Sequence, residues 1–372
     1  MHTDEADFIC TRDKSKKFII RTMKLALVLR KKYTTGNLPH IFQSGLAVSI
    51  FKDKSTRTRY SFASAASMLG LGLFDFDETT SQISHGETLA ETANMLGFTT
   101  RVIGIRDDMY IGIGDTYMRR VAAALQWGFD QGTLLSRPSV INLQSDVDHP
   151  TQSLSDLCHL AQLFHGLDNL KGKKITVSWA YSPSYGKPLS VGQGTIALLS
   201  RFGMDITLAY PKGYHLMSDV EEYAAKQSRA SGGRFYIAGD MKEATRGADI
   251  IYPKSWASYD VMKKRTALLA KGNSRALGSL EAYALRQNAH HQKWSCTPEL
   301  LKLTNRGSAL YMHCLPADIS GVNCMRGEVS ADVFERYKAK LYAQAGYKPF
   351  IIASMILMGQ YHGDIGAIQK KI

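Results

Sequence analysis

Four short segments carry side chains that can bind an anion or stabilise a developing negative charge. The first is STRTR at 55–59, which follows an apolar run ending at Phe51 and precedes residues at helical spacing. Hydroxyl groups and free backbone N–H groups at a helix start, together with the guanidinium of Arg57, can cradle a phosphate without glycine. An ordinary helix N-cap beside exposed arginines is the alternative interpretation.

Two further segments follow apolar runs in the same way. Arg106 ends the run at 100–106, and HPTQS at 149–153 follows the run at 138–144. Proline fixes the turn in HPTQS, and His149 and Gln152 can present hydrogen-bond donors. A solvated arginine and a capped turn are the structural alternatives.

The fourth segment is MHCLPAD at 312–318, in which an expected strand ends near Cys314. A thiol in such a place is either an activated nucleophile or a small buried apolar residue. The chain has five cysteines and no C-x-x-C pair, which indicates reduced thiols and a cytoplasmic protein.

The elements that must position these segments form a parallel α/β pattern, because short β-rich runs alternate with helical patterns. Strands are expected in a first set and a second set, at 45–51, 70–76, 100–106, 138–144 and at 174–180, 204–210, 248–254, 308–314. The 372 residues exceed the size of one ordinary core, so two domains are expected. We therefore predict two doubly wound α/β domains with parallel sheets, whose ligands bind beyond the carboxyl ends of the strands.

The domain boundary is predicted in the helical run at 153–167. The first domain spans 1–155, with the C-terminal helix at 345–372 packing back on it, and the second spans 156–344. The longest apolar stretch, 350–359, is about half of the length that crosses a bilayer.

The net charge of +13 is spread along the chain, and its Lys/Arg runs do not exceed three residues. A nucleic-acid-binding protein needs clustered basic residues with interleaved aromatics, so that class of function is disfavoured. A solvated basic surface is the simpler interpretation. The alternative is a positive field that steers small anions to a cleft.

STRTR, Arg106, HPTQS and HCLPA, in this order on two α/β domains, resemble the aspartate and ornithine carbamoyltransferase superfamily over nearly the whole chain. The resemblance is greatest to the bacterial knotted carbamoyltransferases of unassigned acceptor. It implies an enzyme that transfers the carbamoyl group of carbamoyl phosphate to an amine of a small amino-acid-like acceptor, in nitrogen metabolism, with release of phosphate. It implies no metal and no organic cofactor.

The resemblance also implies roles for the first domain. The residues that hold carbamoyl phosphate are Ser55, Thr56, Arg57, Thr58, Arg106, His149 and Gln152. Arg106, His149 and Thr58 would be catalytic, because donors aimed at the carbonyl oxygen stabilise the charge that builds there. His149 is either such a donor or a general base. We favour the donor, since the amine can lose its proton to the departing phosphate.

SQISHGET at 81–88 resembles the loop that a neighbouring subunit inserts into the active site of aspartate carbamoyltransferase. The family pattern has lysine where this chain has His85. Despite this difference, Gln82 and His85 are expected to reach the phosphate across a homotrimer interface. The alternative is a helix N-terminus with Glu87 near the positive end of its dipole.

HCLPA resembles the ornithine branch, but the Asp and the Ser-Met-Gly loop of that branch are missing after 248–253. The predicted contacts of the second substrate are Lys254, Trp256, Cys314, Leu315 and Arg326. A cation at Lys254 disfavours plain ornithine and favours a carboxylate-bearing diamine or an acylated amine. The Pro/Gly loop at 181–194 is similar to the loop of knotted relatives, so a trefoil knot is expected in the second domain.

Three other interpretations remain. G-x-G-x-x-A at Gly192, Gly194 and Ala197 is typical of dinucleotide-dependent oxidoreductases, but a long loop separates it from the preceding strand. A carbamoyltransferase fold that has lost catalysis and serves binding or regulation is the second. A metal site at 290, 291 and 296 is the third, and its spacing matches no zinc pattern.

Overall fold

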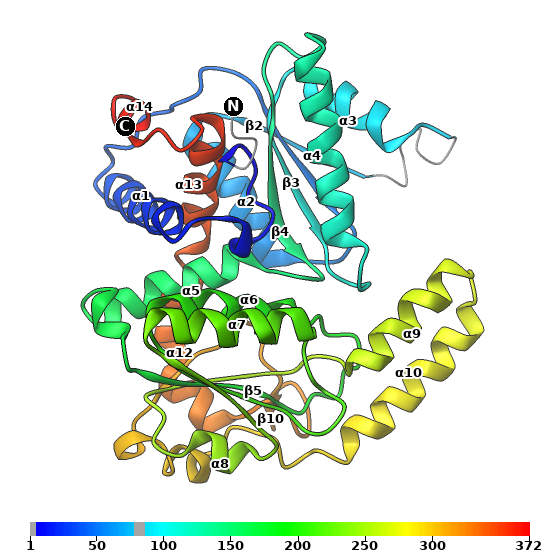
Figure 1. Ribbon diagram of the computed structural model, residues 1–372, viewed down its shortest axis with the longest axis vertical. Helices are drawn as coiled ribbons and strands as arrows, with labels where there is room; N and C mark the ends of the chain where they lie inside the picture. Colours follow the sequence, from blue (N-terminus) through cyan, green and yellow to red (C-terminus); the bar gives the residue numbers. More distant parts are fainter. Residues whose placement is uncertain (1–4, 78–85) are drawn as a thin grey trace. The chain divides into compact units, whose positions relative to one another are not determined.

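The computed structural model describes residues 5–77 and 86–372, and the chain divides into two compact units (Figure 1). Unit 1 comprises Met1–Asp108, Gly112–Leu154 and Tyr347–Ile372, and unit 2 comprises Met109–Ile111 and Ser155–Gly346. Each unit is an α/β structure built on a parallel sheet, which confirms the predicted fold class. None of the described helices is long and apolar enough to cross a membrane.

Unit 1 contains a four-stranded parallel sheet in the order β2-β1-β3-β4. Its strands are β1 (Leu46–Phe51), β2 (Gly72–Phe76), β3 (Thr100–Asp107) and β4 (Ser139–Ser145). All four lie where the sequence predicts them. The chain winds outwards in opposite directions from β1 and β3, so the polar residues after these two strands meet at the topological switch point.

Helices cover both faces of this sheet (Figure 1). They are α1 (Lys16–Thr34), α2 (Thr56–Leu69), α3 (Leu89–Gly97), α4 (Gly114–Asp130), α13 (Lys348–Gln360) and α14 (Ile365–Gln369). Ile103 and Ile105 of β3 share a buried cluster with residues of α3 and α4. Gly104, between them, faces α2 on the other side, where an added Cβ would lie 2.5 Å from the ring of Phe62. The alternation of a strand thus sets which helix packs on which face.

The N-terminal segment closes the β4 edge of the sheet. Phe8 forms a parallel bridge with Ile141, and its N–H donates to the carbonyl of Val140 at 2.8 Å. Further along, the N–H and the hydroxyl of Thr11 both donate to the buried carboxylate of Asp148 at 2.7 Å. This segment therefore holds the loop that leads into His149.

Unit 2 contains a five-stranded parallel sheet in the order β7-β6-β5-β8-β9. Its strands are β5 (Lys174–Trp179), β6 (Asp205–Ala209), β7 (Arg234–Ala238), β8 (Ile250–Lys254) and β9 (Leu310–Tyr311), and a separate parallel pair is β10 (Ile319–Ser320) with β11 (Val329–Ser330). The sequence did not indicate β7, a half-exposed edge strand without a continuous apolar run. The switch point lies between β5 and β8. The loop at 181–189 follows β5, and Lys254 is the last residue of β8.

The α-helices of unit 2 are α6 (Ser190–Leu199), α7 (Ser218–Ser231), α8 (Met241–Thr245), α9 (Tyr259–Ala270), α10 (Ser274–Ala289), α11 (Pro298–Leu301) and α12 (Ala331–Ala345), while α5 (Pro150–Leu163) spans the division between the units. Short 3-10 turns are Thr11–Asp13, Asp168–Leu170, Ser200–Phe202 and Asn305–Gly307. Figure 1 shows α9 and α10 as a hairpin that extends away from the sheet of unit 2. Val261, Leu280 and Ala284 form a small core in this hairpin, against which Tyr185 packs.

Candidate active site

The switch point of unit 1 brings the STRTR segment and Arg106 together. Ser55 is the N-cap of α2, and its hydroxyl accepts the N–H of Thr58 at 3.3 Å. Nη1 of Arg106 donates to the hydroxyl of Ser55 at 3.2 Å and to that of Thr58 at 3.5 Å. Hydroxyl groups, a guanidinium and the N-terminus of a 14-residue helix therefore converge on one place, which is a favourable environment for an anion.

A cavity of about 610 Å³ opens beside this helix start. Its lining consists of Phe51, Lys52, Asp53, Lys54, Ser55, Thr56 and Arg59. Three of these side chains are cationic and one is anionic, so the cavity has a surplus of positive charge. Thr56 and Arg57, in the first turn of α2, are exposed to solvent.

His149 and Gln152 lie at the start of α5, after β4. His149 is buried, and its Nδ1 is 3.3 Å from the hydroxyl of Thr151. Burial, together with the positive charges of Lys348, Arg106 and Arg57, holds the pKa of His149 well below its ordinary value. The imidazole is therefore neutral at pH 7 and lies within the electrostatic reach of both arginines. Gln152 is buried beside it.

Asp108 is a member of this site that the sequence analysis missed. Its fully buried carboxylate lies 2.8 Å from Nη2 of Arg106. Burial raises the pKa of Asp108 to about 6, although the charge of Arg106 opposes the shift. The feature of the sequence that could have indicated Asp108 is its position two residues after Arg106, near the end of an expected strand.

The switch point of unit 2 is organised by a second carboxylate that the sequence analysis missed, Glu328. Its side chain is fully buried, and its Oε1 accepts the N–H of Ser255 at 2.6 Å and lies 3.2 Å from Nζ of Lys254. Its Oε2 accepts the N–H of Asp318 at 2.9 Å and lies 3.2 Å from Nε2 of His313.

The charge of Glu328 is kept by its neighbours. Burial alone would raise its pKa, but Lys254, His313 and Lys187 together outweigh burial and hold the pKa well below the ordinary value. His313 is neutral, because burial lowers its pKa and its Nδ1 accepts the N–H of Leu315 at 2.9 Å. Its Nε2 therefore carries the proton and lies 3.2 Å from Oε2 of Glu328.

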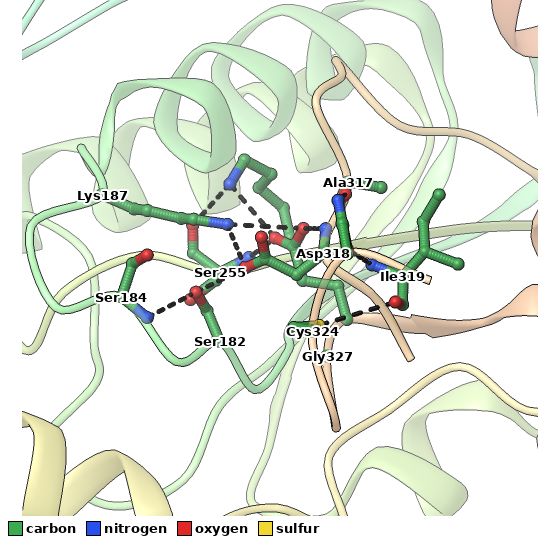
Figure 2. Close-up of polar contacts among 12 residues, drawn as sticks. Ser182, Ser184, Lys187, Ser255, Ala317, Asp318, Ile319, Cys324 and Gly327 are labelled. Carbon is green, nitrogen blue, oxygen red and sulfur yellow. Dashed lines mark hydrogen bonds and ion pairs between the residues drawn. The ribbon is translucent and has the colours of Figure 1, made fainter. Parts of the chain in front are cut away.

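Lys187 links the Pro/Gly loop to this cluster. Its Nζ lies 2.5 Å from Oδ2 of Asp318 and 3.6 Å from Oε2 of Glu328. The hydroxyl of Ser182 donates to the same oxygen of Asp318 at 2.5 Å, and the N–H of Ser184 donates to that hydroxyl at 3.0 Å. Figure 2 shows Lys187, Ser182 and Asp318 converging from two separate segments of the chain.

The five residues predicted to contact a second substrate lie in different environments. Lys254 is buried and paired with Glu328, and its Nζ also donates to the carbonyl of Ser255 at 2.8 Å. Trp256 is a core residue, 1% exposed, whose indole N–H donates to the carbonyl of Tyr214 at 2.8 Å. Arg326 is exposed and donates to Oε1 of Gln292 at 2.7 Å.

Cys314 and Leu315 lie closer to the charged cluster. Cys314 is buried, and it contributes to the electrostatic environment of Lys187. Leu315 has a φ of +53°, in the left-handed region that leucine rarely adopts. Its hydrogen bond to His313 helps to hold this conformation. Gln82 and His85, predicted to act from a neighbouring subunit, lie outside the described residues.

Comparison with known families decides the identity of this arrangement. Residues 6–162 match the aspartate/ornithine carbamoyltransferase carbamoyl-P binding domain, and residues 187–358 match the aspartate/ornithine carbamoyltransferase Asp/Orn binding domain. The chain belongs to the aspartate/ornithine carbamoyltransferase family. The predicted family and enzyme class are thereby confirmed: this is a transferase of carbamoyl groups.

Individual relatives agree with this assignment of a carbamoyltransferase. YgeW of Escherichia coli (strain K12), which carries a provisional carbamoyltransferase name, is 53% identical over 360 residues that cover 97% of this chain and 91% of YgeW. Ornithine carbamoyltransferase of Caldicellulosiruptor saccharolyticus is 27% identical over 340 residues, covering 91% of this chain and 93% of the relative.

Solved structures show the same fold as this carbamoyltransferase. Ornithine carbamoyltransferase from Pyrococcus furiosus superposes with a TM-score of 0.74 at 24% identity, covering 97% of this chain and 98% of that one. An N-acetyl-L-ornithine transcarbamylase K302A mutant complexed with PALAO superposes with a TM-score of 0.74 at 22% identity, covering 95% and 99%.

Replacing Glu328 with Gln should destabilise unit 2 of this carbamoyltransferase by about 3 kcal/mol at neutral pH, because the buried ammonium group of Lys254 loses its counter-charge. The pKa of Glu328 in the folded state lies well below its ordinary value of 4.5. The stabilisation is therefore complete above that pH and disappears as pH falls further. Urea unfolding followed by circular dichroism at several pH values measures the difference between wild type and variant.

The matched control is Glu335→Gln, which removes an exposed carboxylate paired with Lys338 on α12. That variant should unfold like the wild type, since exposed ion pairs contribute little. A stability difference for Glu328→Gln that stays constant into acid would contradict the assigned charge of Glu328.

Asp108→Asn should alter the pH dependence of carbamoyl phosphate binding. Above the raised pKa of about 6, ionised Asp108 neutralises Arg106 and competes with the bound anion; below it, protonated Asp108 does neither. Wild-type affinity should fall, relative to the variant, by up to about tenfold as pH rises through this value. Titration calorimetry measures the dissociation constant of carbamoyl phosphate for both proteins at each pH. The ratio of the two constants does not depend on the ionisation of the ligand, which is the same for both proteins. Parallel affinity profiles would refute the role of Asp108.

Proposed function

We propose that this protein transfers the carbamoyl group of carbamoyl phosphate to an amine of a small, amino-acid-like acceptor and releases phosphate. The observation that carries the proposal is the convergence of Ser55, Thr58 and Arg106 at the switch point of unit 1. Ser55, Thr56, Arg57 and Thr58 would hold the phosphate at the start of α2. Arg106, His149 and Gln152 would contact the carbonyl and amide ends.

The chemistry follows from the protonation states. The acceptor amine attacks the carbamoyl carbon, negative charge builds on the carbonyl oxygen, and the C–O bond to phosphate breaks. Arg106, Thr58 and His149 would donate to this oxygen. Because the pKa of His149 lies well below its ordinary value, its imidazole is a weak base at pH 7 and a suitable neutral donor. The proton of the amine can then leave with the phosphate.

Unit 2 would supply the acceptor site at the switch point between β5 and β8. Cys314 and Leu315 are suitably placed beside the cluster of Lys187, Asp318 and Glu328. Lys254, Trp256 and Arg326 complete the proposed acceptor contacts. Trp256 is packed in the core behind the site, and the charge of Lys254 is balanced by Glu328. A carboxylate-bearing diamine or an acylated amine remains the proposed acceptor class.

The proposed active form is a homotrimer in which Gln82 and His85 act in a neighbouring subunit. Unit 1 exposes apolar side chains at Leu73 and Phe74 of the edge strand β2, and at Met95 and Phe98 around α3. Exposed apolar side chains on an edge strand commonly indicate an interface. A cytoplasmic location, a role in nitrogen metabolism and a knotted path for 181–194 belong to the same proposal.

The function is tested by measuring phosphate release from carbamoyl phosphate across a panel of amino acids, diamines and acylated amines, with calorimetry of carbamoyl phosphate alone. Acceptor-dependent release would support the proposal. Arg57→Ala should weaken carbamoyl phosphate binding by about 100-fold or more, since it removes a bidentate partner of the phosphate. Arg120→Ala, an exposed position on α4, is the control.

Retention of tight binding by Arg57→Ala would refute the assignment of the STRTR segment. Absence of carbamoyl phosphate binding by the wild type would refute the proposed activity and favour a fold that has been recruited for binding or regulation.

Phe74→Asp should yield monomers that have lost acceptor-dependent activity, because it places a charge in the proposed interface and the active site is shared. Ile237→Asp is the matched control, since Ile237 is similarly exposed on β7, the edge strand of unit 2. Analytical ultracentrifugation and phosphate release measure both variants. A fully active monomer would refute the proposed sharing of sites.

A further inference from the structure

Arg265, on α9, lies over two tyrosine rings of unit 2. Its guanidinium carbon lies 4.9 Å from the ring centroid of Tyr110 and 5.4 Å from that of Tyr185. Aromatic faces attract a guanidinium and restrict its orientation without satisfying its N–H groups. The side chain is thus positioned in advance while its hydrogen-bonding capacity is retained.

No carboxylate neutralises Arg265 within residues 5–77 and 86–372. Its Nη1 is buried and has no hydrogen-bond partner among the described residues. A buried donor without an acceptor is costly, so such a group in a native protein requires an explanation. A bound anion would supply the missing acceptors, since a guanidinium presents several N–H groups that match a carboxylate in a bidentate arrangement.

The position of Arg265 connects it with the proposed acceptor site. An added Cβ at Gly186 would lie 3.0 Å from Nη1, so the backbone of the Pro/Gly loop passes directly against the guanidinium. The next residue in the loop is Lys187, whose ammonium pairs with Asp318 beside Glu328. Arg265 therefore contacts the same loop from which Lys187 reaches this charged cluster.

The charges of the cluster make Arg265 distinctive. Lys187 pairs with Asp318, and Lys254 pairs with Glu328, so two ammonium groups meet two carboxylates. His313 adds no charge, because its imidazole is neutral. The positive charge of Arg265 has no counterpart there.

We propose that Arg265 binds a carboxylate of the acceptor and thereby determines which amines this enzyme accepts. This inference rests on the proposed carbamoyltransferase activity and deepens it, because it assigns the anion-binding role to a residue outside the set predicted from the sequence. Lys254 then pairs with Glu328 at the end of β8, while Arg265 binds the carboxylate of the substrate.

The competing explanation is that Arg265 only fastens the α9–α10 hairpin to Tyr185. The two roles differ in what they affect. A fastening role would change stability and would lower the affinity for all acceptors to a similar extent. A carboxylate-binding role would lower the affinity for carboxylates and spare their amides.

The test uses matched pairs of ligands that differ only in this group: L-ornithine, N-acetyl-L-ornithine and L-norvaline, each with its carboxamide. Calorimetry of the full chain with saturating carbamoyl phosphate should show, for at least one pair, about tenfold or tighter binding of the carboxylate. Arg265→Gln should abolish this preference, and Arg265→Lys should restore part of it. Arg275→Gln, an exposed position on α10, should keep the wild-type preference.

A preference that persists in Arg265→Gln would overturn the proposal, as would a wild-type enzyme without preference in every pair. An equal loss of affinity for carboxylate and carboxamide would favour the fastening role and also overturn it. Binding of carbamoyl phosphate alone, measured for each variant, reports separately on the proposed activity and should not change.

Discussion

The buried carboxylate of Glu328 is the interaction on which the second half of the site depends. A lone carboxylate in the protein interior is too costly to stay charged, so its partners must remain in place. Those partners come from the end of β8, through Lys254 and the N–H of Ser255, and from the segment that follows β9, through His313 and the N–H of Asp318. The two segments are therefore fixed as one unit, and the unusual backbone of Leu315 is part of what they hold.

Unit 1 distributes its charges differently, and the difference suits its ligand. The cations around the start of α2 exceed the anions, and Asp108 compensates only Arg106. Burial, together with the positive charges of Lys348, Arg106 and Arg57, keeps His149 neutral. A proposed site for a phosphorylated substrate benefits from an excess of positive charge and from donors that are not themselves bases. Unit 2, by contrast, neutralises its lysines before any ligand arrives.

Much of this arrangement could be predicted from the sequence, and the omissions have a common cause. Apolar runs bounded by polar turns identified eight of the strands, and hydroxyl residues before a helical pattern identified the start of α2. Glu328 carries no comparable signal, because its burial depends on partners such as Lys254, 74 residues earlier. Asp108 was missed because its pairing with Arg106 is a feature of burial and not of pattern. Trp256, predicted to contact substrate, packs in the core, since an aromatic residue after a strand end fits either role.

The compensation of the lysines also limits where an acceptor can carry its negative charge. An anion placed against Lys187 or Lys254 would approach Asp318 or Glu328 as well, and like charges at short range in a buried site repel strongly. Displacing either carboxylate would break an ion pair inside the cluster. Breaking a buried ion pair costs several times more free energy than an exposed ion pair contributes. An anionic group is therefore best accommodated outside the cluster, where Arg265 is positioned and unpaired. Selection among acceptors then depends on whether they carry a carboxylate that Arg265 can bind.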